Sequence, residues 1–332
     1  MNSQKILIIG FGSIGRRHAN NILRITNASL IIFTKRKNIK PEEFFQYGKN
    51  RNRITITSDL TKCLNENPSI AFITNETSLH LKYAIPLAKR GIDLFIEKPL
   101  SHSLAHLDSL SSIIKQNKLV VMVGCNFRFY PPIRKIKELV DKKLAGKIIS
   151  VQSENGSYLP EWHPDEDYSK GYAARKDLGG GVTLTQIHEL DYLTWIFGPA
   201  DFSHSVGGKF SQLRTTAEDL CACLLKLSTN VVVELHLDYF SKPYYKRLKI
   251  RGTNGTIYWN SNKNNVQFYD NLTNNWKTIN VYGNYKLISK NVNRMYVEEL
   301  KYFLKCIANR IQPMNNLQES SLTLGLALKI KP

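Results

Sequence analysis

A glycine-rich run near the start of the chain restricts the possible folds most strongly. It reads Gly10-Phe11-Gly12-Ser13-Ile14-Gly15 and lies between an apolar run at residues 5–9 and a stretch with helical spacing at residues 14–23. This order predicts a strand, a tight loop and a helix. In such a unit the glycines allow the turn, the approach of a pyrophosphate to the backbone, and close packing of the helix. The run therefore predicts a dinucleotide-binding loop, because N–H groups at a helix N-terminus attract anionic oxygens.

The first 124 residues repeat this alternation of strand and helix. Apolar runs at residues 30–33, 70–73, 93–96 and 119–123 are typical of strands, and residues 79–90 and 104–117 have helical spacing. Strands that alternate with helices predict a parallel, doubly wound sheet. Continuous apolar strands also fit a sheet that is covered on both faces. We therefore predict a dinucleotide-binding Rossmann domain over residues 1–124.

The pattern changes after Cys125, where strands begin to predominate. Helices are expected at residues 132–143 and 182–196, with a strand at residues 148–154 and an irregular aromatic segment between them. Strands at residues 220–227, 231–239, 247–251 and 256–259 are separated by turn signals, and a last helix is expected at residues 297–310. The predicted fold class is α/β, with a second, α+β domain over residues 125–332 whose sheet is mainly antiparallel.

Composition excludes several classes of protein. With 332 residues, of which 42% are hydrophobic and 22% charged, the chain fits two soluble domains, and no apolar stretch approaches the roughly 20 residues that span a bilayer. The first apolar run is too short for a secretory signal, so we expect a cytoplasmic protein without membrane partners. The five scattered cysteines predict neither a metal site nor a disulfide framework. The net charge of +19 is spread along the chain without a nucleic-acid-binding signature, so no nucleic-acid partner is expected.

The residues after the second predicted strand bear on the choice of cofactor. Proteins that bind NAD usually place Asp or Glu there to bind the ribose 2′-hydroxyl. This chain has Thr34-Lys35-Arg36-Lys37 instead. A hydroxyl group beside basic side chains suits a 2′-phosphate, so we predict NADP rather than NAD. The alternative is a solvated basic turn in an already basic protein.

Several further motifs lie at matching places along the chain. They are Arg17-His18, Thr77-Ser78-Leu79-His80, Glu97-Lys98-Pro99, Asn126-Phe127-Arg128-Phe129 and Gly179-Gly180-Gly181, the last followed by His188-Glu189-Leu190-Asp191. Together with the glycine loop, they resemble the Gfo/Idh/MocA oxidoreductase family over nearly the whole chain. The segment from Tyr158 to Pro164 is similar to that of members in surface-polysaccharide or nonulosonic-acid sugar pathways.

The resemblance implies roles for residues of the first domain. Lys98 would lie beside the nicotinamide and hydrogen-bond the substrate carbinol oxygen, where an ammonium group stabilises developing charge and shares in proton transfer. Its alternative role is that of a surface lysine at a strand end. The predicted cofactor contacts include the glycine loop, Thr34, Lys35 and Arg36. The family motifs add Asn75, His80, Glu97, Lys98 and Asn126.

In the second domain, Thr185, His188 and Asp191 recur at intervals of three on one predicted helix, so we expect them on one face. Many family members carry an aspartate at the position of Thr185, which binds or deprotonates the substrate hydroxyl. Because threonine cannot act as a base at physiological pH, His188 becomes the leading general acid or base. The alternative is a structural histidine. The resemblance implies substrate contacts for Arg128, Thr185 and Asp191.

An aromatic and basic segment precedes that helix. It contains Tyr158, Trp162, His163, Tyr172, Arg175 and Lys176. Aromatic faces stack on sugars, and arginine or lysine binds carboxylate or phosphate, so we expect this segment to bind a sugar acid or a nucleotide-linked sugar. The alternative is a surface loop anchored by buried aromatic rings.

These patterns together predict an NAD(P)-dependent oxidoreductase that transfers a hydride at a secondary hydroxyl or ketone of a sugar, in surface-glycan biosynthesis. The departure at Thr185 keeps open a regulatory or catalytically altered protein that binds the dinucleotide without net turnover. By resemblance, we expect a homodimer or homotetramer formed through the sheet of the second domain.

Overall fold

A computed structural model describes residues 4–36, 39, 52–263, 265–281 and 292–332 of the chain. The chain forms two compact units. Unit 1 comprises Met1–Gly124 and Tyr296–Ser321, and unit 2 comprises Cys125–Met295 and Leu322–Pro332. The chain therefore crosses from unit 1 to unit 2 after Gly124 and returns to unit 1 at Tyr296, whereas the sequence predicted two continuous domains.

Unit 1 contains a six-stranded parallel sheet in the order β3-β2-β1-β4-β5-β6. Its strands are β1 (Lys5–Ile9), β2 (Ser29–Phe33), β3 (Ile54–Thr57), β4 (Ile70–Ile73), β5 (Asp93–Glu97) and β6 (Val121–Gly124). Strands β4, β5 and β6 are buried along their whole length, as a sheet covered on both faces requires. The predicted doubly wound parallel sheet is confirmed; β3 is the one strand of this sheet that the sequence patterns did not predict.

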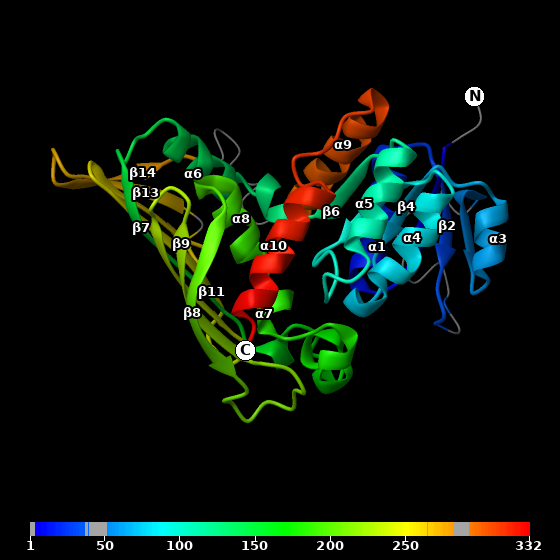
Figure 1. Cartoon of the computed structure of the whole chain (residues 1–332), viewed down its shortest axis with the longest axis horizontal. Helices are drawn as coiled ribbons and strands as arrows, with labels where there is room; N and C mark the ends of the chain where they lie inside the picture. The colour runs from blue at the N-terminus through cyan, green and yellow to red at the C-terminus, as the bar shows by residue number, and fades with distance from the viewer. Residues whose placement is uncertain (1–3, 37–38, 40–51, 264, 282–291) are drawn as a thin grey trace. The chain divides into compact units, whose positions relative to one another are not determined.

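Helices connect these strands. They are α1 (Ser13–Ile25), α3 (Leu60–Asn65), α4 (His80–Lys89) and α5 (Leu107–Gln116). Helices α4 and α5 lie side by side (Figure 1). Each of α1, α4 and α5 buries one apolar stripe and exposes the opposite side, which is the pattern that the helical spacing predicted.

The returning segment of unit 1 packs against the parallel sheet. It includes most of α9 (Asn293–Asn309) and the start of α10 (Leu317–Ile330). The ring of Phe303 lies 5.8 Å from that of Phe72 and 5.5 Å from that of Phe95. The Asn315 carbonyl accepts a hydrogen bond from the Val123 amide at 2.9 Å. These contacts explain why residues 296–321 belong to unit 1, although they follow unit 2 in sequence.

Unit 2 contains an eight-stranded sheet in the order β14-β13-β12-β11-β7-β10-β9-β8. The strands are β7 (Ile148–Gly156), β8 (Ala200–Gly208), β9 (Leu220–Leu227), β10 (Val232–Asp238), β11 (Tyr245–Gly252), β12 (Gly255–Asn260), β13 (Asn265–Asp270) and β14 (Asn275–Ile279). Only β7 and β10 pair in parallel, so the prediction of a mainly antiparallel sheet is confirmed.

One face of this sheet is covered by helices and the other is open. Helices α6 (Pro131–Asp141), α7 (Val182–Thr185) and α8 (His188–Phe197) lie on the same side in Figure 1. In β10 the side chains of Val233, Leu235 and Leu237 are buried, whereas Val232 and Glu234 on the opposite face are exposed. The alternation thus separates a core face from a surface face, as a period of two requires.

The single helix predicted over residues 182–196 is wrong, because α7 ends at Thr185 and α8 begins at His188. Between them Gln186 has φ −97° and ψ 28°, outside the helical region. Its side-chain amide donates to the Ser157 hydroxyl at 3.2 Å and to the Asp238 carbonyl at 3.0 Å. These bonds to the residue after β7 and to the end of β10 hold the chain in the break, so Thr185 and His188 do not share a helix face.

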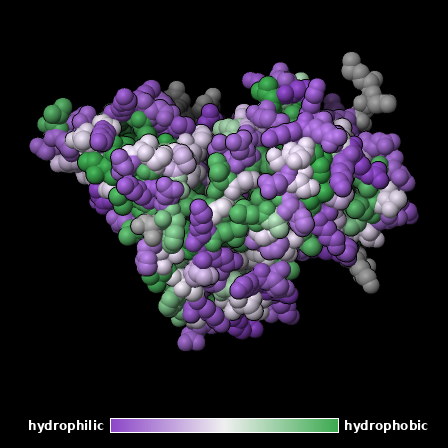
Figure 2. All heavy atoms as spheres, in the orientation of Figure 1, coloured by the Kyte–Doolittle hydropathy of each residue, from purple (hydrophilic) through white to green (hydrophobic). Residues whose placement is uncertain are grey.

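In the described part of the chain, no helix is both long and apolar enough to cross a bilayer. Hydrophilic residues cover much of the face shown in Figure 2, with hydrophobic residues scattered between them.

Candidate functional site

The glycine loop has the geometry that a dinucleotide requires. Gly10 has φ +94°, and a Cβ atom there would lie 2.8 Å from the Asn75 backbone. A Cβ atom on Gly15 would overlap the Gly10 carbonyl oxygen. By contrast, no atom lies within 4 Å of a Cβ atom built on Gly12. Gly10 and Gly15 are therefore required by packing, and Gly12 leaves open space at the place where a pyrophosphate would approach.

Helix α1 begins directly after this space. Its N-cap residue, Gly12, offers no side chain to the first-turn N–H groups, and the first turn carries no acidic residue. Ser13 is exposed and Ile14 half-buried, whereas the Phe11 side chain is buried in the core. The N–H groups and the helix dipole therefore suit an anion, and Phe11 offers its backbone rather than its ring.

Strand β2 ends directly before Thr34, Lys35 and Arg36, the residues predicted to select NADP over NAD. The Thr34 side chain is buried, and its hydroxyl accepts a hydrogen bond from the Arg36 amide at 3.2 Å. Lys35 and Arg36 are exposed. Lys37, which also belongs to the predicted basic cluster, lies outside the described residues. The Thr34 hydroxyl shapes this turn, and two cationic side chains remain accessible beside it.

Lys98 follows β5 directly, at the C-terminal edge of the parallel sheet where ligands bind in such folds. Its side chain is half-buried. The neighbouring Glu97 is buried, and its carboxylate accepts hydrogen bonds from the Lys98 amide at 3.1 Å and from His18 Nε2 at 2.7 Å. The Glu97 side chain therefore orders the backbone of this edge.

Two further predicted cofactor residues follow β4, the strand between β1 and β5. Burial lowers the pKa of His80, whose ring nitrogens face the carbonyls of Pro99, Leu100 and Asn75 at 2.9, 3.3 and 3.1 Å. A neutral imidazole carries one N–H, so His80 donates to the backbone from one nitrogen and packs against a carbonyl with the other. The Asn75 Oδ1 atom has no hydrogen-bond partner among the described residues, so Asn75 retains an acceptor.

In unit 2, Arg128 and Asp191, two predicted substrate contacts, bind one another. They are 1% and 0% exposed. Arg128 Nη2 lies 2.7 Å from Asp191 Oδ1, and Arg128 Nε lies 3.0 Å from Asp191 Oδ2. This ion pair attaches α8 to the 3-10 turn Asn126–Phe129. Substrate contact by either residue stays a prediction. Asn126 is also buried, and its Oδ1 atom has no hydrogen-bond partner within the described part of the chain.

A second buried ion pair lies beside His188. Lys246 on β11 binds Glu189 on α8, and both side chains are almost fully buried. The Lys246 ammonium also lies 4.2 Å from the centre of the Phe127 ring, and the centre of the His188 ring lies 4.9 Å from that ring. His188 is half-buried at the first position of α8. Sequence reasoning missed Lys246, because nothing in its own strand distinguishes it from the exposed lysines of the chain.

Thr185 is buried at the end of α7. Burial raises the pKa of Tyr239, and a hydrogen bond with Thr185 opposes that rise, so the two hydroxyl groups lie together. The Tyr239 hydroxyl also donates to the Ala173 carbonyl at 3.3 Å. The Thr185 hydroxyl therefore contributes to a polar cluster in the core of unit 2.

Aromatic rings anchor the aromatic segment, as expected for a surface loop, and other side chains of the segment remain accessible. The Trp162 ring packs edge-on against Tyr239 at 5.6 Å, and its N–H donates to Ser157. Tyr158 is half-buried beneath the Lys242 ammonium, which lies 3.9 Å from the ring centre. Arg175 pairs with Asp177 at the surface and lowers the pKa of that carboxyl. Tyr172 is half-buried, and Lys176 and His163 are exposed.

Protein-family models match most of both units. Residues 4–125 match the "Oxidoreductase family, NAD-binding Rossmann fold", and residues 133–258 match the "GFO/IDH/MocA C-terminal domain". The chain belongs to the Gfo/Idh/MocA oxidoreductase family. Family membership accounts for the dinucleotide-binding geometry of the glycine loop and for the mainly antiparallel sheet of unit 2.

Relatives of this Gfo/Idh/MocA chain include sugar and polyol dehydrogenases. It is 27% identical over 197 residues to myo-inositol 2-dehydrogenase of Thermotoga maritima, a match that covers 58% of this chain and 55% of that protein. The chain thus spans little more than half the length of that relative. The fold matches a levoglucosan dehydrogenase solved with NADH, with TM-score 0.82, 17% identity, and coverage of 99% and 96%. It also matches UDP-N-acetylglucosamine 3-dehydrogenase from Acidithiobacillus ferrooxidans, with TM-score 0.75, 18% identity, and coverage of 100% and 97%.

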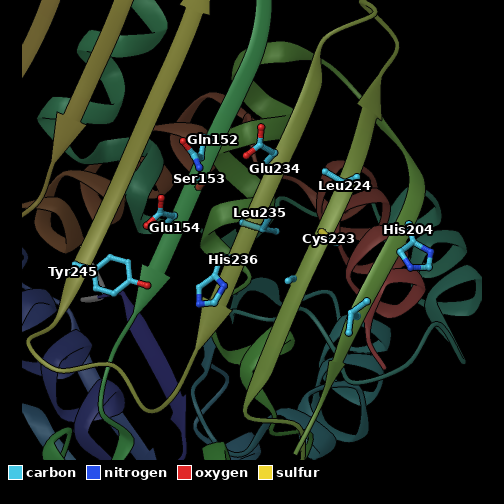
Figure 3. Close-up of a pocket in the computed structure, with 12 residues that line it drawn as sticks. Gln152, Ser153, Glu154, His204, Cys223, Leu224, Glu234, Leu235, His236 and Tyr245 are labelled. Atoms are coloured by element: carbon cyan, nitrogen blue, oxygen red, sulfur yellow. The ribbon is translucent and has the colours of Figure 1, made fainter. Parts of the chain in front are cut away.

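The open face of the eight-stranded sheet carries a shallow hollow of about 540 Å³ (Figure 3). Its lining includes Glu154, Glu234 and His236, and none of the predicted site residues. A hydrogen bond from His236 to the buried Asp238 at 2.9 Å raises the pKa of His236. Among the described residues, no group of three or more His, Cys, Asp or Glu side chains is placed to hold a metal ion.

Proposed function

We propose that this protein is an NAD(P)-dependent oxidoreductase that transfers a hydride at a secondary hydroxyl or ketone of a sugar or nucleotide-linked sugar. The observation that carries this proposal is the edge of the parallel sheet in unit 1. The glycine loop follows β1 and Lys98 follows β5 at that same edge, with Asn75 after β4 between them. Phosphate-binding groups and an ammonium group thus occupy neighbouring strand ends, as a bound dinucleotide requires.

The chain's own residues take distinct roles in this reaction. The bound nicotinamide supplies the hydride chemistry, and the protein supplies binding, orientation and proton transfer. The N-terminus of α1 binds the pyrophosphate. Lys98 hydrogen-bonds the carbinol oxygen and stabilises the charge that develops on it. His188 exchanges the hydroxyl proton, because no carboxylate occupies the position of Thr185 and an imidazole can both accept and donate a proton near neutral pH.

The cofactor that we propose is NADP. Lys35 and Arg36 are exposed after β2, and the Thr34 hydroxyl already binds the Arg36 amide. Two cations beside the expected ribose suit a phosphate better than a hydroxyl.

The substrate that we propose is a sugar that carries an anionic group. Printed names of the relatives include dehydrogenases of myo-inositol, levoglucosan and UDP-N-acetylglucosamine. In unit 2, Lys242 places a cation over the Tyr158 ring, which is the combination that an anionic sugar needs, and Lys176 in the same aromatic segment is exposed. We assign the protein to surface-glycan biosynthesis in the cytoplasm on the basis of its resemblance to members of those pathways.

The assembly that we propose is a homodimer or homotetramer formed through the open face of the sheet. Val206, Leu224 and Val232 are apolar side chains on that face, and they are between 46% and 58% exposed. Exposed apolar groups that lie together on one face favour association with a second copy.

A direct assay tests the proposed reaction. Purified protein is incubated with NAD or NADP and a panel of neutral, acidic and nucleotide-linked sugars, and absorbance of the reduced nicotinamide is followed. We expect turnover with at least one anionic sugar and loss of that turnover in Lys98→Met. Absence of turnover with every sugar, in both directions, would contradict the proposal.

A second candidate is a regulatory protein that binds the dinucleotide without turnover. It is favoured by Thr185, which is buried where many relatives have a carboxylate. The two candidates differ in cells: a regulator would keep its phenotype in Lys98→Ala and His188→Ala but lose it in Gly12→Asp, whereas an enzyme would lose it in all three.

A further inference from the structure

Two buried histidines of unit 1 contact the residues on either side of Lys98. His18 is 0% exposed and binds the Glu97 carboxylate on the N-terminal side. His80 is 1% exposed and faces the Pro99 and Leu100 carbonyls on the C-terminal side. A buried polar side chain is costly unless its hydrogen bonds are made, so two of them around one lysine require an explanation.

The first histidine joins Lys98 to the helix that follows the glycine loop. His18 lies on α1, and its Nε2 donates to Glu97 Oε1 at 2.7 Å. The other oxygen of that carboxylate accepts the Lys98 amide at 3.1 Å. The rings of Phe72 and Phe95 lie 5.3 and 4.9 Å from the His18 ring and hold its orientation. The position of the Lys98 backbone is thus set by α1 through a single carboxylate.

The second histidine joins the other side of Lys98 to the glycine loop itself. His80 Nε2 faces the Asn75 carbonyl at 3.1 Å, while its Nδ1 faces Pro99. The Asn75 backbone packs so closely on Gly10 that a Cβ atom there would approach it to 2.8 Å. The adjacent Thr74 hydroxyl donates to the Gly10 carbonyl at 2.9 Å. Movement of this loop would therefore displace Asn75, His80 and the segment after Lys98 together.

We propose that His18 and His80 are positioning residues that hold Lys98 in register with the glycine loop. We call this pair the brace. His18 links α1 to the Glu97 carboxylate, and His80 lies between the Asn75 and Pro99 carbonyls. The brace aligns the Lys98 ammonium with the nicotinamide end of a dinucleotide whose phosphates are bound at α1. This inference assigns His80 a role through the backbone in place of direct cofactor contact, and it rests on the proposed role of Lys98. A displacement of about 1 Å at a reacting group lowers a rate by about 100-fold, so a brace of this kind has a measurable consequence.

Amide hydrogen exchange tests the brace without any substrate. In His18→Leu the carboxylate loses the donor that orients it, and a hydrogen bond to a charged group is worth roughly a tenfold to hundredfold change in local opening. We expect exchange at the Lys98 amide to accelerate by about tenfold or more, while amides within β5 change by less than about threefold. His18→Gln, which keeps a donor at a similar reach, restores most of the protection. His102→Leu removes an exposed histidine of the same unit and serves as the matched control.

Kinetics separates positioning from cofactor binding. In His18→Leu and His80→Leu we expect kcat to fall by about 100-fold, while the Kd for NADP stays within about threefold of the parent value. A merely structural role would instead weaken cofactor binding and exchange protection throughout unit 1. If a leucine variant fails to fold, His18→Asn replaces it, because asparagine keeps a polar group but cannot reach Glu97 from that position.

Each result decides the inference. Unchanged exchange at Lys98 in the folded variants of both histidines overturns the brace. Faster exchange throughout β5 also overturns it, because the histidines would then stabilise the whole sheet. If the parent turns over no sugar, the proposed function fails, yet exchange and cofactor affinity still test the brace. If the exchange results overturn the brace but Lys98→Met still abolishes turnover, the proposed function is supported and the brace is rejected.

Discussion

The buried pair Arg128–Asp191 allows a decisive test of whether these residues position α8 or bind substrate. Arg128→Met removes the cation and leaves the Asp191 carboxylate 0% exposed without its partner. Breaking a buried pair in this way costs about 3–5 kcal/mol, whereas replacing both partners by apolar side chains is close to neutral or stabilising. We therefore expect Arg128→Met to lower the unfolding free energy of unit 2 by about 3–5 kcal/mol. The double variant Arg128→Met/Asp191→Leu should recover most of that loss.

Tryptophan fluorescence during chemical denaturation measures the unfolding free energy of unit 2. All four tryptophans of the chain lie in the unit 2 segment, and the Trp195 ring lies 5.6 Å from the Arg128 guanidinium. Lys142→Met, which removes one partner of an exposed ion pair on α6, is the control and should leave the transition unchanged. The reasoning is refuted if Arg128→Met unfolds like the parent. It is also refuted if the double variant folds normally but its KM for the sugar rises sharply, because the pair would then bind substrate.

Three shorter predictions concern unit 1. Gly12→Ala should weaken dinucleotide binding in a titration without changing the unfolding transition, whereas Gly15→Ala should destabilise the unit by about 1–3 kcal/mol, because its Cβ atom meets the Gly10 carbonyl. Lys35→Ala combined with Arg36→Ala should raise the Kd for NADP by about tenfold or more and leave the Kd for NAD unchanged; equal effects on both would assign the cofactor to NAD. Burial lowers the pKa of His80 below the ordinary histidine value of 6.5, so the unfolded chain binds the proton more readily, and the contribution of His80 to stability is complete above pH 6.5 and is lost as the pH falls. The unfolding free energy should therefore decline on acidification by at most about 1.4 kcal/mol per pH unit from this residue, and His80→Gln should remove that slope.

Much of the fold follows from patterns that can be read along the chain. Runs such as residues 6–9 and 94–96 are continuously apolar, and in a chain where strands and helices alternate only a doubly covered parallel sheet buries them. The alternation of buried and exposed residues in β10 likewise requires one core face and one surface face. The glycine loop was also predictable, because each of its outer glycines satisfies a local steric requirement.

The site depended on contacts that no local pattern encodes. Arg128 and Asp191 are 63 positions apart, and each alone is indistinguishable from a charge available to a substrate. The break between α7 and α8 arises because Gln186 binds Ser157 and Asp238, so a helical period over residues 182–196 did not show it. Lys246 became recognisable only when β11 placed it against Glu189 and Phe127.

The sequence by itself determined five of the six strands of the parallel sheet, the mainly antiparallel character of the second sheet, the glycine loop and the family, because these depend on periodicity and on steric rules that act within a few residues. The tertiary structure alone decided which charges are paired, which helices are interrupted and where residues 296–321 pack. These depend on side chains brought together from distant parts of the chain, and the free energy of a buried charge is set by the partner that it meets.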